Sequence, residues 1–341
     1  MKTERKIINE SRNVVLTSYL QEVGGEFANI SKRPGIVILP GGGYRYCSTR
    51  EMDPVAFAYL KAGYQVFILC YSTGEHSEWP TPLNDYDEAM EYIKSNAENF
   101  ALDKDRIAVV GFSAGGHLAA AAATLANHRP AAAVLGYAPV LKEFIDAYLD
   151  GNGPDIISAV DENTCPCFIF SSRADNIVPI INSIKFMEAL SGADVTFESH
   201  IYAYGPHGFS TADASVQEKG TPLAVRTPNW VNDSIGFLRD VMGEFGHGVI
   251  DNPVCEPTVS GNHDKVLSTR CTVKYLMSYP EARAIVQPII DTLKKVYPIP
   301  AMAAVAEALT ANMHLAEVMA YLSATPEMIQ TADAQLAQIE K

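Results

Sequence analysis

The sequence predicts an α/β fold, a three-layer sandwich with a mostly parallel central sheet, followed by a small all-α module. Between residues 34 and 246, short β-branched runs alternate with helical patterns, which is typical of a sheet covered by helices on both faces. The alternation stops near residue 250, and only short helical patterns follow. Hydrophobic residues make up 48% of the 341 residues and charged residues 19%, which provides a sizeable core and excludes a disordered chain.

The elements of the sheet layer follow in order along the chain. A weak pattern at 14–23 predicts an antiparallel edge strand or hairpin ahead of the parallel part. Apolar, β-branched runs then predict strands at 35–39, 65–70, 106–110, 132–136, 167–171 and 195–203. Helical periodicity between them predicts helices at 53–62, 85–99, 114–126, 180–190 and 229–242.

The domain organisation follows from composition. Residues 1–247 form the predicted catalytic domain, 248–263 a linker rich in Gly, Pro, Asn and Ser, and 264–341 a helical module. Within the module, Thr325 and Pro326 match the N-cap and first position of a helix. Five of the ten methionines fall in this module, which suits either an adaptable interface or ordinary core packing.

Charge and leader signals limit the partners. The net charge is −14, nearly all of it in residues 1–263, which disfavours nucleic acid and anionic membranes. No apolar leader or membrane-spanning run is seen, so a cytoplasmic location is expected. Six scattered cysteines indicate reduced thiols. Cys165 and Cys167 lead into an apolar run without a partner pair, which favours buried thiols over a metal or redox site.

The most informative motif is Gly111-Phe112-Ser113-Ala114-Gly115, placed between a strand and an alanine-rich helix. A serine nucleophile needs this context, because the turn is so tight that only small residues fit two positions before and after it. The helix N-terminus favours the negative charge that develops during attack. Ser113 is therefore predicted to be a catalytic nucleophile and not merely part of a structural turn.

An activated serine needs a base and an orienting carboxylate. Asp175 and His207 both follow predicted strands, in the chain order serine, acid, histidine. Asp161 is a weaker alternative acid because no strand closely precedes it. His200 lies within a strand and His117 follows the elbow, so both are expected to pack or cap locally.

The backbone groups that would bind an oxyanion are also predicted. Ala114 follows the nucleophile, and Pro40-Gly41-Gly42-Gly43-Tyr44 follows an early strand. Ala114 with Gly42 and Gly43 are the predicted donors, without a choice between the two glycines. A phosphate-binding loop is the alternative, but neither of its usual glycine patterns is present.

Four motifs together resemble the bacterial α/β-hydrolases grouped with acetyl-xylan esterases, relatives of hormone-sensitive lipase and prolyl oligopeptidase. The motifs are the triple-glycine loop, the serine elbow, Asp175-x-x-Val178-Pro179 and Gly205-x-His207-Gly208. The resemblance covers residues 30 to 245 and implies hydrolysis of short acyl esters, often acetyl groups on plant polysaccharides. The sequence departs from the family pattern at Tyr71-Ser72 and Cys165-Pro166, which affects the pocket wall and local packing.

The residues after the glycine loop are candidate substrate contacts. Tyr44, Tyr46, Arg50 and Glu51 offer rings for sugar stacking and charges for hydroxyl groups, or else form a solvated loop. We therefore expect a serine esterase for a small acetylated oligosaccharide, without metal or cofactor and with a possible homo-oligomer. A peptidase or arylesterase with the same triad, or a non-catalytic binding protein, are the alternatives.

Overall fold

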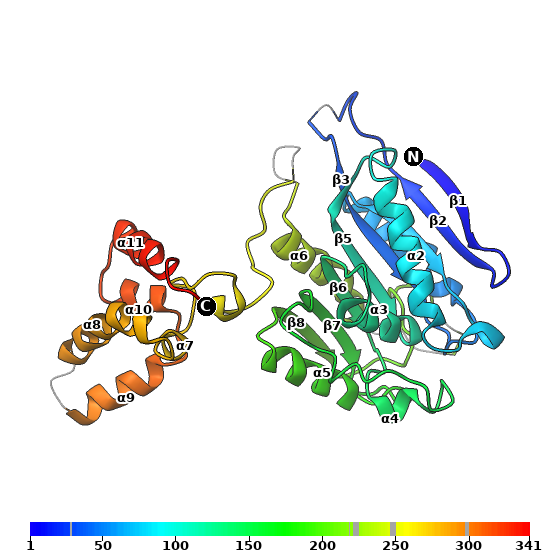
Figure 1. Cartoon of the computed structure of the whole chain (residues 1–341). Helices are drawn as coiled ribbons and strands as arrows, with labels where there is room; N and C mark the ends of the chain where they lie inside the picture. The colour runs from blue at the N-terminus through cyan, green and yellow to red at the C-terminus, as the bar shows by residue number, and fades with distance from the viewer. Residues whose placement is uncertain (28, 218, 221–224, 246–249, 297–299) are drawn as a thin grey trace. The chain divides into compact units, whose positions relative to one another are not determined.

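A twisted sheet forms the centre of residues 1–257, the first of two compact units into which the chain divides (Figure 1). The computed structural model describes residues 1–27, 29–217, 219–220, 225–245, 250–296 and 300–341. Within these ranges eight strands form one sheet, with β1 and β2 antiparallel and the remaining strands parallel. In sheet order the strands are β1 (Lys2–Asn9), β2 (Val14–Leu20), β4 (Gln65–Cys70), β3 (Arg33–Leu39), β5 (Leu102–Phe112), β6 (Ala132–Gly136), β7 (Cys167–Ser172) and β8 (Phe197–Tyr202).

Helices cover both faces of the sheet and create two apolar layers. One layer packs α2 (Thr81–Ser95), α3 (Ala114–Thr124) and α5 (Ile181–Gly192) on the sheet. The other packs α1 (Asp53–Lys61) and α6 (Trp230–Met242) on the opposite face. Every residue of β3 is buried, because a central parallel strand is covered on both sides. The predicted three-layer α/β fold is confirmed.

Two predictions about elements need correction. No strand was predicted at β1, because its charged side chains hide the strand pattern. In the structure β1 pairs with β2 along its length. The helix expected at 85–99 is α2, which begins at Thr81 and ends at Ser95. Asp85 therefore lies inside the helix, where its buried carboxylate accepts hydrogen bonds from the Ser72 N–H and the Arg12 guanidinium at 2.8 and 2.6 Å.

The second unit, residues 258–341, has its own apolar core. Its helices are α7 (Val273–Leu276), α8 (Pro280–Val296), α9 (Pro300–Thr310), α10 (Leu315–Tyr321) and α11 (Pro326–Leu336). Thr325 is the N-cap residue of α11, and Pro326 lies in its first turn, as predicted.

The predicted linker 248–263 is divided between the two units. Residues 246–249 lie outside the described residues, and residues 250–257 belong to the first unit. Thr196 is hydrogen-bonded there to the carbonyl oxygens of Glu256 and Pro257. Arg270 binds the carbonyl oxygens of Thr258 and Ser260 and so ties the remaining stretch into the second unit. The boundary between the units falls after Pro257.

Candidate active site

Ser113 stands at a sharp turn between β5 and α3. Its backbone has φ 51° and ψ −119°, a conformation rare for a residue with a side chain. A Cβ atom at Gly111 would lie 2.1 Å from the Gly115 carbonyl oxygen, and one at Gly115 would lie 2.0 Å from the Leu39 carbonyl oxygen. Only glycine fits at both positions, which is the steric requirement of a nucleophile elbow.

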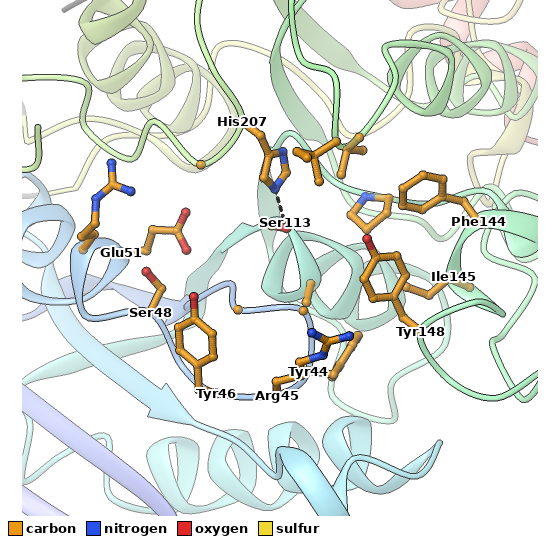
Figure 2. A pocket seen from close by; sticks show the side chains of 18 residues that line it. Tyr44, Arg45, Tyr46, Ser48, Glu51, Ser113, Phe144, Ile145, Tyr148 and His207 are labelled. Atoms are coloured by element: carbon orange, nitrogen blue, oxygen red, sulfur yellow. Dashed lines mark hydrogen bonds between the residues drawn. The ribbon is translucent and has the colours of Figure 1, made fainter. Parts of the chain in front are cut away.

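The three residues expected to form a triad lie in one hydrogen-bonded line. The Ser113 hydroxyl meets His207 Nε2 at 2.9 Å (Figure 2). His207 Nδ1 meets Asp175 Oδ2 at 2.7 Å. Because a carboxylate only accepts hydrogen bonds, Nδ1 carries the proton and Nε2 is free to accept from the serine. This arrangement holds the imidazole in the tautomer that a general base needs.

The second oxygen of Asp175 fixes the carboxylate. Asp175 follows β7, and its Oδ1 accepts the backbone N–H groups of Ile177 and Val178 at 2.8 and 2.9 Å. The side chain is fully buried, so these donors replace the water that an ionised carboxylate would otherwise bind. His207 lies in the loop after β8 and is mostly buried.

Three backbone donors near Ser113 are free to bind a ligand. No acceptor in the described ranges takes the N–H of Gly42, Gly43 or Ala114. Gly41 is different, because its N–H donates to Glu51 at 2.8 Å. Gly42 has φ 129°, and a Cβ there would fall 2.0 Å from the Tyr46 carbonyl oxygen, so the close turn of this loop requires glycine.

These groups open onto a cavity of about 460 Å³. Residues after the triple glycine form one wall, which is polar. The opposite wall is mostly apolar and combines residues from the segment after β6 with others from the turn after Asp175 (Figure 2). Its members are Pro139, Phe144, Ile145, Tyr148, Ile177 and Val178.

The predicted substrate residues take two different positions. Tyr46 is 61% exposed and lines the cavity, and Arg50 also lines it while its Nε donates to the Val216 carbonyl oxygen. Tyr44 and Glu51 also line the cavity, but both are buried, at 2% and 3% exposure. The Tyr44 hydroxyl is hydrogen-bonded to His117 Nδ1, and the Glu51 carboxylate accepts hydrogen bonds from the Gly41 N–H and the Tyr137 hydroxyl.

Sequence reasoning missed the aromatic pair Phe144 and Tyr148. Phe144 belongs to α4 (Lys142–Ile145) and Tyr148 follows it, with ring centroids 5.6 Å apart in a stacked arrangement. One signal could have found them. Phe144 and Tyr148 are four residues apart, which places both side chains on one side of a helical turn, and they follow a strand that ends at the same edge of the sheet as the motifs.

The other histidines and the alternative acid considered from the sequence make contacts outside the Ser113–His207–Asp175 line. His200 pairs with Glu198 and Asp233, and Asp161 pairs with Arg129 at 2.7 Å. His117 packs beneath the glycine loop against Tyr44 and Trp79, and burial lowers its pKa to about 3. This histidine therefore stays neutral near pH 7.

The described residues form neither a three-residue metal site nor a membrane-spanning helix. Across the described ranges, no three His, Cys, Asp or Glu side chains gather in a way that would hold a metal ion. Cys165 and Cys167 are both buried free thiols, as predicted. No helix in the described part of the chain combines the length and apolar character needed to cross a bilayer.

Comparison with known proteins agrees with this fold and site. A family model described as BD-FAE matches residues 27–156. The crystal structure of MGS-M1, an α/β-hydrolase enzyme from a Medee basin deep-sea metagenome library, is 39% identical with a TM-score of 0.67. The match covers 71% of this chain and 98% of that one. The chain belongs to the α/β-hydrolase family, as the four motifs predicted.

Two curated relatives are similar to about half of this chain. Endo-1,4-beta-xylanase B of Butyrivibrio fibrisolvens is 29% identical over 215 residues, 53% of this chain and 33% of that protein. Acetylxylan esterase of Xylanibacter ruminicola is 28% identical over 196 residues, 51% of this chain and 40% of that protein. The matches thus span a third to two fifths of these relatives. Within the family, the similarity is to the acetyl-esterase-like carboxylic-ester hydrolases.

Proposed function

We propose that this chain is a serine esterase that hydrolyses short acyl esters, with acetyl groups on xylo- or other plant-derived oligosaccharides as substrates. The observation that carries the proposal is the line from Ser113 through His207 to Asp175 beside three free N–H groups. A line of this kind at the mouth of a cavity suits attack on a carbonyl carbon. The acetylxylan esterase relative supports the choice of acyl group and sugar.

The proposed reaction has two halves. His207 Nε2 takes the Ser113 proton while Oγ attacks the ester carbonyl, and the N–H groups of Ala114 and of Gly42 or Gly43 bind the resulting oxyanion. Collapse of this intermediate breaks the bond to the alcohol, and His207 returns the proton to the sugar oxygen. A water molecule, deprotonated by His207, then attacks the acyl-serine and releases the acid and free Ser113.

Both walls of the cavity suit the sugar part of such a substrate. Exposed aromatic rings with a polar edge, Tyr46 and Tyr148, stack well on sugar rings, because a pyranose offers an apolar face beside its hydroxyl groups. Ser48 and Arg50 on the same side as Tyr46 supply hydrogen-bonding groups for those hydroxyls. Neither contact requires charge on the substrate, which agrees with the acidic catalytic domain.

The first test is hydrolysis of p-nitrophenyl acetate by the wild type and by Ser113→Ala. We expect the substitution to reduce kcat at least about 10³-fold, because no other group can form the acyl intermediate. Ser191→Ala, at an exposed position in α5, serves as the control and should keep wild-type activity. Equal activity of the Ser113→Ala protein would refute the mechanism.

The substrate class is tested separately. Acetylated xylo-oligosaccharides and peptide anilides are offered to the wild type, and release of acetate or aniline is measured. We expect acetate release and no anilide cleavage. Turnover of the anilides alone would favour the peptidase alternative while leaving the triad intact.

A further inference from the structure

Glu51 is a buried carboxylate in the lining of the cavity, only 3% exposed, and the catalytic steps above do not use it. It ends the short helix η1 (Thr49–Glu51), which follows the glycine loop, here defined as residues 40–48. Burying an ionisable group is costly unless donors compensate it, and burial raises the pKa of this carboxyl. The contacts that Glu51 makes explain why it is there.

Each oxygen of Glu51 binds a different part of the site. Oε2 accepts the Gly41 N–H at 2.8 Å, at the start of the glycine loop. A Cβ on Gly41 would lie only 2.7 Å from this oxygen, so the carboxylate packs directly against the loop backbone. Oε1 accepts the Tyr137 hydroxyl at 2.5 Å.

Tyr137 extends the connection to the loop that carries the catalytic histidine, here called the histidine loop, residues 203–210. Its hydroxyl oxygen accepts the Ser210 N–H at 3.1 Å, and its ring lies edge-on to His207 with centroids 5.0 Å apart. The Ser210 hydroxyl in turn donates to the Arg50 carbonyl oxygen at 2.5 Å, which returns the connection to η1. The glycine loop and the histidine loop thus share one buried carboxylate.

Within the esterase mechanism proposed above, we propose that Glu51 is a positioning residue that holds the glycine loop and the histidine loop in register through Gly41 and Tyr137. The oxyanion donors lie on the first loop and the general base on the second, and both must meet one reacting carbonyl. A displacement of about 1 Å between such groups reduces rates by about 10²-fold. Both Glu51 oxygens already have protein donors, so the residue affects the transition state more than substrate binding.

The test uses the full-length protein with Glu51→Gln, Tyr137→Phe and the double variant. An amide has one acceptor oxygen where the carboxylate has two, so Glu51→Gln keeps the side-chain shape and loses one of the two contacts. Tyr137→Phe removes the link to the histidine loop and leaves the Gly41 contact. Glu75→Gln is the matched control, because the Glu75 side chain is exposed outside this network.

Two measurements are made on each protein. One is the steady-state kcat and KM for p-nitrophenyl acetate. The other is the rate and final stoichiometry of labelling by a fluorophosphonate, in which Ser113 Oγ forms a bond to phosphorus, fluoride leaves and His207 takes the serine proton. The labelling rate reports the alignment of Ser113, His207 and the oxyanion donors. The stoichiometry reports the fraction of folded sites.

We expect Glu51→Gln to lower kcat and the labelling rate about 10- to 100-fold, with KM within about threefold and stoichiometry unchanged. Tyr137→Phe should lower both rates about tenfold. The double variant should be no slower than Glu51→Gln by more than about twofold, because the two residues act through one connection. Glu75→Gln should match the wild type.

Unchanged rates in both single variants would overturn the proposal, as would a fall in stoichiometry without a fall in labelling rate. A wild type that labels but does not hydrolyse esters would refute the proposed function and leave the positioning role to be judged by labelling rates. A wild type that does neither would refute both.

Discussion

At the scale of single residues, the hydrogen bonds of Asp175 and His207 decide which nitrogen carries a proton. Asp175 accepts from two backbone N–H groups through one oxygen and from His207 Nδ1 through the other. The carboxylate is fully buried, so these protein donors take the place of solvent around it. The orientation of the imidazole therefore depends on the Asp175 side chain.

Replacing Asp175 with Asn is expected to reduce kcat about 10³- to 10⁴-fold, since an amide favours the wrong histidine tautomer. Asp161→Asn is the informative control, because Asp161 is the other acid the sequence offered and it pairs with Arg129. Steady-state kinetics with p-nitrophenyl acetate compare the two. A larger loss in Asp161→Asn would reverse the assignment of the acid.

A second prediction at this scale concerns the pH dependence of stability, and it rests on His117, which is buried against Tyr44. Burial keeps His117 neutral in the folded protein and lowers its pKa to about 3, below the ordinary value of about 6.5 for histidine. The unfolded chain binds a proton there at higher pH, so stability is full above about pH 6.5 and falls as pH drops towards 3. The slope from this one group is at most about 1.4 kcal/mol per pH unit.

Urea unfolding at pH 7.5 and pH 5 checks this dependence. His117→Asn should lower the stability at pH 7.5 and reduce the loss between the two pH values, because the titrating group is gone. His76→Asn, at a partly exposed histidine, should keep the wild-type difference. An unaltered pH dependence in His117→Asn would contradict the neutral, buried state.

At the scale of elements, the junction of β5 and α3 positions the nucleophile by close backbone contact. The N-terminus of α3 approaches the end of β3 so closely that a methyl group at Gly115 would meet both Leu39 and Pro40 carbonyl oxygens, at 2.0 and 2.4 Å. The unusual backbone of Ser113 persists because these contacts surround it. The elbow is therefore both a functional and a packing feature.

Gly115→Ala should lower the free energy of unfolding by about 3 kcal/mol or more, because the added carbon has no room beside rigid backbone. Gly236→Ala is the opposite case, in the middle of α6 with nothing within 4 Å of the new carbon. It should raise stability by about 0.5 to 1 kcal/mol. Chemical denaturation measures both, and equal effects would contradict the elbow packing.

Elements that the sequence predicted well share one property, a local pattern. β4 and β6 have the predicted bounds, because buried parallel strands are continuous apolar runs between turns. β1 was missed because an edge strand with charged side chains gains its order from pairing with β2, which no local window records. The start of α2 was placed at Asp85, four residues after Thr81, where the helix begins.

The residues of the candidate site also divide into those that a local motif predicts and those that only a distant contact brings in. Ser113, Asp175 and His207 were predicted from motifs at strand ends, and Gly42, Gly43 and Ala114 from the sequence around two turns. The contact between Glu51 and Tyr137 joins residues 86 positions apart, so the sequence around one residue does not indicate the other. The sequence also does not reveal that the Tyr44 hydroxyl reaches His117.

At the scale of the whole molecule, the cavity is lined entirely by residues of the first unit. The last residues of the first unit, 250–257, contact Thr196 and Arg106. The Glu256 carbonyl oxygen accepts a hydrogen bond from Thr196, and the Arg106 guanidinium donates to the Asp251 carbonyl oxygen. The second unit has a separate core. Activity and the second unit are therefore expected to be separable.

A chain ending after Pro257 should keep kcat and KM for p-nitrophenyl acetate within about twofold of the full chain. A chain ending at residue 247 should unfold at lower denaturant concentration, because Thr196 and Arg106 lose hydrogen-bond partners. Kinetics and urea unfolding of the two truncated proteins test this. Loss of activity in the longer one would show that the second unit contributes to catalysis.

The apolar wall of the cavity has a consequence for how substrate preference changes over evolution. Phe144, Ile145 and Tyr148 come from one continuous segment between β6 and β7, whereas the nucleophile, acid and base come from other strand ends. The length and sequence of that segment can vary without moving the reacting groups. Exchanging residues 141–153 between relatives is thus expected to change which sugars are accepted while the triad residues stay in place.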